Sequence, residues 1–107
     1  MKRIAPEESF LRAVIDLAHM HGWRVAHFRT ARTKSGWRTA VGADGVGWPD
    51  LFMCRSDEAL VRELKVPPND LTPEQKEWLE TLNAAGVDAR VWTPDDWPEI
   101  EATLRTQ

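Results

Sequence analysis

Two short apolar runs lie close together in the middle of the chain, at Leu51–Arg55 and Leu60–Lys65. The polar triplet Ser56-Asp57-Glu58 separates them, which is typical of a tight turn between two strands. Pro67 and Pro68 follow the second run, and proline is not tolerated in the middle of a sheet. The sequence therefore predicts a central β-hairpin whose second strand ends at about residue 65.

Helical and strand patterns flank this hairpin. Apolar residues recur at helical spacing from about Pro6 to His21, and Thr72-Pro73-Glu74-Gln75 carries the residues of a capping box with proline at the first helical position. The predicted elements are a helix over 6–21, strands over 23–28, 51–55 and 60–65, a helix from 73 towards 86, a strand over 87–92 and a short helix after 93. The order α-β-β-β-α-β-α predicts an α/β fold, a small mixed sheet flanked by helices.

Length and composition restrict the possible classes of protein. A chain of 107 residues can bury one modest core, so we expect a single domain over 1–107. Its longest apolar runs are only a few residues, which argues against a membrane span. The single cysteine favours a reducing, intracellular setting, so we expect a cytoplasmic location. A single cysteine excludes an internal disulfide framework, and the position of Cys54 within an apolar run predicts a small buried side chain.

Basic residues are concentrated in one part of an otherwise acidic chain. The net charge is −3, yet the segment 17–43 contains no acidic residue. Its basic residues are Arg24, Arg29, Arg32, Lys34 and Arg38. Most of them lie in 29–47, a segment without clean periodicity that predicts a long loop or β-arm, and Trp37 lies among them. This composition favours contacts to nucleic-acid phosphates and bases, the alternative being a solvated loop.

Three charged residues around the predicted hairpin indicate a chemistry. Asp50 follows Gly47-Trp48-Pro49 at the start of one strand, and Glu63 and Lys65 lie on the next. Because side chains alternate along a strand, Glu63 and Lys65 project to the same face. An acid and an amine are costly to bury unless they are paired or bind a metal. An Asp, a Glu and a Lys at one end of a sheet can hold Mg²⁺ and activate a water for phosphodiester hydrolysis; the alternatives are a turn residue and a solvated strand face.

Other candidate ligands give weaker signals. His19, His21 and His27 do not form a spacing typical of a metal site, and we expect surface or helix-end positions for them. Trp78, Trp92 and Trp97 are expected to be core residues rather than ligand-stacking ones. The role of Trp48, which lies close to the predicted site, stays open.

Taken together, these motifs resemble the virus-type replication-repair nuclease (VRR-NUC) domain of the PD-(D/E)xK nuclease superfamily. The matching segments are Phe10, Val14–Ala18, Gly22-Trp23, Arg29–Lys34, Asp44–Leu51, Glu63–Lys65, Leu71–Gln75 and Ala85–Val87. The resemblance covers nearly the whole chain and looks closest to the compact stand-alone members of phages and prophages. It implies a restriction-endonuclease-like fold and a single nuclease domain, in a bacterial host cell or a phage-infected cell.

The resemblance also implies a metal site. Carried over by position, Asp50 and Glu63 would be ligands of Mg²⁺ or Mn²⁺, with the Leu64 backbone carbonyl as a third. Lys65 would position or help to deprotonate the attacking water and stabilise charge on the phosphate.

Two further positions match the family pattern but have competing explanations. Glu7 would be the ligand from the first helix, although Glu8 is adjacent and could replace it. Gln75 matches a polar residue near the metal, but its place in the capping box explains a glutamine there without any catalytic role.

The activity implied by the resemblance is metal-dependent hydrolysis of DNA. Stand-alone relatives resemble Holliday-junction resolvases, so branched DNA as substrate and a homodimer are implied. The arm residues Arg29, Arg32, Lys34, Trp37 and Arg38 would contact that DNA. The alternatives are a nuclease acting on flaps, nicks or single strands, and a non-catalytic nucleic-acid-binding module of a phage replication or repair complex.

Overall fold

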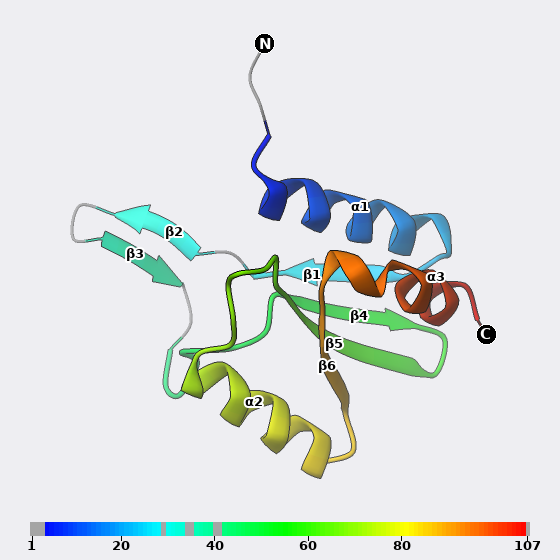
Figure 1. Ribbon diagram of the computed structural model, residues 1–107. Coiled ribbons are helices and arrows are strands. Elements are labelled where there is room, and N and C mark those ends of the chain that lie inside the picture. Colours follow the sequence, from blue (N-terminus) through cyan, green and yellow to red (C-terminus); the bar gives the residue numbers. More distant parts are fainter. Residues whose placement is uncertain (1–3, 29, 34–35, 40–41, 107) are drawn as a thin grey trace.

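The computed structural model describes residues 4–28, 30–33, 36–39 and 42–106, with the backbone alone for 30–33 and 36–39. Its elements follow in the order α1 (Pro6–Met20), β1 (Arg24–His27), β2 (Thr30–Thr33), β3 (Gly36–Thr39), β4 (Leu51–Arg55), β5 (Glu58–Leu64), α2 (Pro73–Ala84), β6 (Asp88–Trp92), a 3₁₀ turn (Pro94–Asp96) and α3 (Trp97–Arg105) (Figure 1). The predicted α/β class and the predicted succession of helices and central strands are confirmed.

The central sheet is mixed and has the strand order β1-β4-β5-β6. Strands β1, β4 and β5 are antiparallel neighbours, while β6 pairs with β5 in parallel after the α2 crossover. Strands β2 and β3 form a separate antiparallel hairpin within the segment predicted as a loop or β-arm. This hairpin projects away from the sheet on the side where β1 ends (Figure 1).

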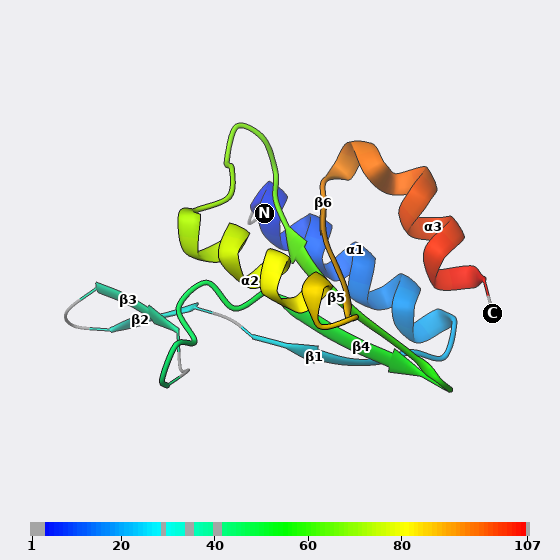
Figure 2. The same cartoon turned by 90° about the horizontal axis from the view of Figure 1, so that it is seen from below.

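Helices cover both faces of the sheet (Figures 1 and 2). Helices α1 and α3 pack on one face, where Val14, Met53 and Ile100 are fully buried in the larger core cluster. Helix α2 packs on the other face, where Leu79 meets Val61 in a smaller cluster. The helical spacing of the apolar residues and the two-residue period of the strands thus produce a three-layer arrangement.

One burial prediction is wrong. Cys54 is exposed, although it lies in an apolar run. Alternation along β4 directs Leu51 and Met53 into the larger cluster and places Phe52 and Cys54 on the α2 face. Phe52 packs into the smaller cluster there, whereas Cys54 lies towards the far end of the strand and stays accessible.

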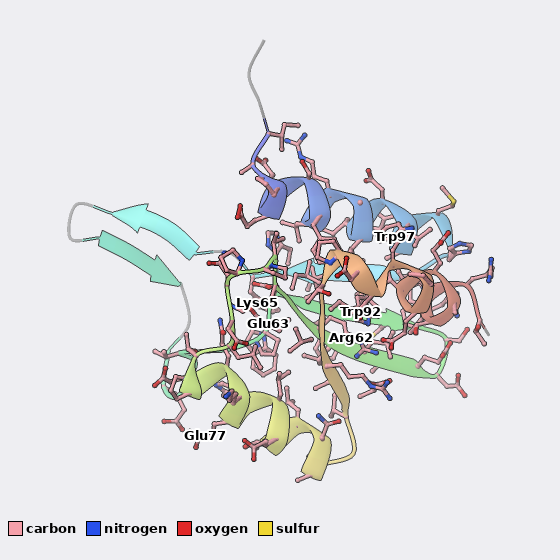
Figure 3. The ribbon with its side chains drawn as sticks, viewed as in Figure 1. Arg62, Glu63, Lys65, Glu77, Trp92 and Trp97 are labelled. Atoms are coloured by element: carbon pink, nitrogen blue, oxygen red, sulfur yellow. The ribbon has the colours of Figure 1, made fainter. Side chains whose placement is uncertain are left out.

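The three tryptophans predicted for the core differ in their surroundings. Trp92 is fully buried, and its ring lies 4.5 Å from the guanidinium of Arg62, which is also buried (Figure 3). Burial lowers the pKa of Arg62, and the nearby Asp88 carboxylate, 3.1 Å away, partly offsets that effect. Trp97 is half-buried against the larger cluster, and Trp78 is half-buried on α2.

The loop before β4 lies directly against the first turn of α2. Gly47 has a φ of +87°, and a Cβ atom there would lie 2.6 Å from the backbone carbon of Glu74 and 2.8 Å from the amide nitrogen of Gln75. No other residue type fits both this backbone conformation and this approach. Gly47 therefore sets the distance between the Asp50 loop and the start of α2.

We expect Gly47→Ala to lower the free energy of unfolding by roughly 2–4 kcal/mol, because it adds a backbone clash to the left-handed φ penalty. Two control variants, measured by urea unfolding, separate the cost of the backbone clash from the cost of the left-handed backbone conformation. Gly86 has a φ of +89° with nothing within 4 Å of an added Cβ, so Gly86→Ala should cost only about 1 kcal/mol. Gly42 also has open space and no such φ, so Gly42→Ala should cost little. Equal losses for Gly47→Ala and Gly86→Ala would show that the close approach is not limiting.

Candidate active site

Asp50 is held at the start of β4 by two neighbouring strands. Its backbone carbonyl accepts a 2.9 Å hydrogen bond from the Phe28 amide just after β1. Its side-chain Oδ2 accepts a 2.8 Å hydrogen bond from the Leu64 amide at the end of β5. The β4–β5 register pairs Leu51 with Arg62, so the next position along the ladder places Asp50 beside Glu63. The hairpin itself thus brings the two acids together.

Glu63 and Lys65 lie on the same side of the chain, as their spacing predicts. Lys65 Nζ is 3.4 Å from Glu63 Oε2, and Figure 3 shows the two residues at the end of β5. Glu63 is only 3% exposed, which is unusual for a carboxyl group. A buried acid, a second acid and an amine therefore meet at this end of the sheet.

Burial and mutual repulsion favour the protonated forms of the two carboxyl groups. Burial, followed by the neighbouring charge of Asp50, raises the pKa of Glu63 to about 8, although Lys65 acts in the opposite direction. Burial also raises the pKa of Asp50, against the hydrogen bond from the Leu64 amide. Because each carboxyl group influences the pKa of the other, the two titrate as a pair and not independently.

A cavity of about 650 Å³ opens over this cluster. Its lining residues are Glu7, Glu8, Leu11, His27, Phe28, Asp50, Glu63, Leu64, Lys65, Val66, Asn69 and Gln75. Every residue predicted for catalysis or metal binding is among them. Within the described part of the chain, however, no three His, Cys, Asp or Glu side chains converge closely enough to hold a metal ion, so the first-helix acids line the cavity without joining the Asp50–Glu63 pair.

Gln75 has the capping role that its sequence context allows. The Thr72 amide donates to Gln75 Oε1 at 2.9 Å, and the Gln75 amide donates to Thr72 Oγ1 at 3.2 Å. These reciprocal bonds form the predicted capping box. The bond to Thr72 uses the side-chain oxygen and leaves the side-chain NH₂ group as a donor at the cavity.

A family model of the VRR-NUC domain matches residues 12–95, which is most of the chain. The chain belongs to the VRR-NUC domain family. It is accordingly an endonuclease-type domain that binds DNA. The matched region contains Asp50, Glu63, Lys65 and Gln75 and begins after Glu7 and Glu8. No curated protein matches the chain.

The arm residues are placed only in part. Arg29 and Lys34 lie outside the described residues, while Arg32 belongs to β2 and Trp37 and Arg38 to β3. The backbone register pairs Arg32 with Trp37 across this hairpin. Their contact with DNA stays a prediction. Among the described helices, none combines the length and the apolar character that a bilayer crossing needs.

The sequence did not indicate five of the cavity residues, which are Leu11, His27, Phe28, Val66 and Asn69. His27, expected at the surface, is half-buried at the end of β1 and lines the cavity, where its charge lowers the pKa of Asp50. Phe28 follows it and lines the same cavity. A lone histidine gives no sequence signal. Only the β1–β4 register, which pairs His27 with Leu51, places these residues beside Asp50.

Proposed function

We propose that this VRR-NUC domain is a divalent-metal-dependent DNA endonuclease in which Asp50 and Glu63 hold Mg²⁺ or Mn²⁺. The supporting observation is the buried pair itself, because burial raises the pKa of both carboxyl groups and a bound cation would favour their ionised forms. Carboxylate oxygens are the hard ligands that such cations prefer. When bound, the cation supplies Lewis-acid activation of the phosphate and a lowered pKa for water.

The Leu64 backbone would complete this ligand set. Its amide donates to Asp50, and the N–H and C=O of one strand residue project to the same side. The carbonyl oxygen of Leu64 therefore faces the side of β5 on which Asp50 lies. Glu7 from the first turn of α1, with Glu8 as the alternative, also lines the cavity and would add a carboxylate.

Lys65 would act on the attacking water and on the phosphate. Its Nζ lies 3.4 Å from Oε2 of the Glu63 carboxyl group, and this contact holds the side chain at the cavity. From there it can orient a water by hydrogen bonding and stabilise charge that develops on a non-bridging phosphate oxygen. The first turns of α1 and α2 also line the cavity, and helix N-termini favour an anionic group.

The substrate proposed is branched DNA, cut by a homodimer in the manner of a Holliday-junction resolvase. A two-fold dimer presents two identical sites, which symmetric cutting of a four-way junction requires. The described elements are one sheet, its covering helices and one hairpin, which leaves little surface for reading base sequence. Basic residues on the arm would bind the backbone, and phosphate contacts position DNA without reading its sequence.

A cleavage assay tests this proposal on labelled DNA of five kinds: four-way junction, flap, nicked duplex, single strand and linear duplex. Each substrate is incubated with Mg²⁺, Mn²⁺ or EDTA, and Asp50→Asn serves as the inactive variant. Paired symmetric nicks across the junction, absent in EDTA and in Asp50→Asn, are expected. Cutting of flap or single-stranded DNA alone would retain the nuclease and exclude the resolvase. DNA binding without cleavage of any substrate would indicate the non-catalytic binding module instead.

Gln75→Glu separates capping from catalysis, because glutamate also completes a capping box at this position. We expect the thermal stability of the variant to stay close to that of the wild type. Cleavage should fall roughly tenfold, since a carboxylate replaces an NH₂ donor beside the phosphate. Thr72→Ala is the matched control, as it removes the cap and keeps the amide. Full activity of Gln75→Glu would leave Gln75 as a helix cap only.

A further inference from the structure

Phe28 is a large apolar side chain exposed at the rim of the catalytic cavity. The residue is 36% exposed and lines the cavity that contains Asp50 and Glu63. A phenyl ring does not coordinate a hard cation and donates no hydrogen bond to a phosphate. The hydrolytic chemistry proposed above therefore gives no reason for this ring to be there.

The ring is held in place by other aromatic side chains. Phe28 meets Trp48 edge to face, with ring centroids 5.9 Å apart and an interplanar angle of 85°. Trp48 packs in the same manner on Trp78, at 5.0 Å and 83°. Trp78 Nε1 in turn donates a 2.9 Å hydrogen bond to the carbonyl of Asp44. Pairs of this geometry stabilise beyond their buried area, so Phe28 is fixed before any ligand binds.

The backbone also ties Phe28 to the reacting centre. Its amide donates to the Asp50 carbonyl at 2.9 Å, so the ring cannot move far from the Asp50 carboxyl group. Leu11, Leu64 and Val66 give the cavity further apolar lining. A cavity of about 650 Å³ lies within the size range that encloses a small organic ligand. Its size and apolar lining suit a base and a sugar in addition to a phosphate group.

We propose that Phe28 is a stacking platform for one nucleobase beside the scissile phosphate, and that it selects DNA with an unpaired or unstacked base at the cut. This inference rests on the proposed nuclease function of the same cavity. In a continuous duplex both faces of each base are covered by neighbours, and removing a base from the stack costs a few kcal/mol. Flaps and single strands present an uncovered base at no such cost, and a four-way junction presents one at its branch point once its arms are unstacked. Stacking on Phe28 therefore favours them over intact duplex.

Binding in EDTA tests the platform without cleavage, using DNA that carries 2-aminopurine at a single unpaired position and a matched continuous duplex. Stacking on an aromatic ring quenches 2-aminopurine fluorescence. Wild type and Phe28→Trp should quench the unpaired probe. Phe28→Leu, which keeps the apolar contact and removes the ring, should bind the unpaired DNA roughly tenfold more weakly and quench little. Affinity for the continuous duplex should stay the same in all three proteins.

The control variant is Met20→Ala, because Met20 is an exposed apolar residue at the end of α1 that lies away from Glu7. Thermal melting of each variant checks that the fold is retained. Wild-type affinity and quenching in a folded Phe28→Leu variant would overturn the platform, even if the protein cleaves DNA. A Phe28-dependent preference for the unpaired probe in a protein that never cleaves would support the platform and refute the proposed nuclease function. An equal loss of affinity for duplex and for unpaired DNA in Phe28→Leu would also overturn the platform.

Discussion

Lys65→Met lowers the rate of DNA cleavage by about 10³-fold, while affinity for uncleaved DNA in EDTA changes little. Methionine keeps the length and the apolar stem of the side chain and removes the ammonium that lies 3.4 Å from Glu63 Oε2. Two effects combine. The variant loses the donor that orients water and stabilises the phosphate, and it loses a positive charge that lowers the pKa of Glu63. Glu63 then holds its proton more firmly against an incoming cation.

Single-turnover cleavage at saturating Mg²⁺ or Mn²⁺ measures this loss. Lys76→Met is the matched control, because Lys76 is exposed on α2 and does not line the cavity that contains Asp50 and Glu63. Lys65→Arg keeps the charge but replaces a compact ammonium with a planar guanidinium, and we expect it to recover only part of the activity. Cleavage by Lys65→Met at the rate of the Lys76→Met control would exclude Lys65 from the chemistry.

The proximity of Asp50, Glu63 and Lys65 could be predicted from the sequence because it depends on short-range rules. The two-residue period of a strand places Glu63 and Lys65 on one face. The two-residue turn at Ser56-Asp57 makes β4 and β5 neighbours and fixes their register, and this register brings Asp50 beside Glu63. Both inferences need only a few consecutive residues and the geometry of a hairpin.

The surroundings of that centre could not be predicted, because they depend on contacts between distant segments. His27 and Phe28 reach the cavity through the pairing of β1 with β4, which joins residues more than twenty positions apart. The exposure of Cys54 depends on how far α2 extends over its face of the sheet. Neither relation leaves a periodic pattern in the sequence, and a charged pair of strand residues does not reveal how deeply it is buried.

The burial of Glu63 has a consequence for stability that its sequence position does not indicate. In the folded protein the pKa of Glu63 is raised to about 8 from an ordinary value of 4.5. Between pH 4.5 and about pH 8, Glu63 therefore keeps its proton in the folded state and has lost it in the unfolded state. The free energy of unfolding therefore falls as pH rises through this window. Asp50, whose pKa is also raised, contributes with the same sign.

We expect the metal-free protein to lose roughly 2–4 kcal/mol of stability between about pH 5 and pH 8, with little further loss from Glu63 above that range. Glu63→Gln keeps the shape of the side chain and cannot ionise, so its stability should depend much less on pH. At pH 8 in EDTA this variant should be more stable than the wild type. Urea unfolding across the pH range measures both curves, with Glu80→Gln, an exposed carboxyl group on α2, as the control.

A divalent cation should reverse the effect in the wild type alone. If Mg²⁺ or Mn²⁺ binds the ionised carboxylates of Asp50 and Glu63, saturating metal stabilises the wild type at pH 8 and has little effect on Glu63→Gln. Parallel pH curves for the two proteins in EDTA would refute the buried carboxyl pair as the source of the instability. An equal stabilisation of the wild type and Glu63→Gln by metal would show that the cation binds at a site without Glu63. The instability of the metal-free site thus measures how strongly these two carboxylates require a cation.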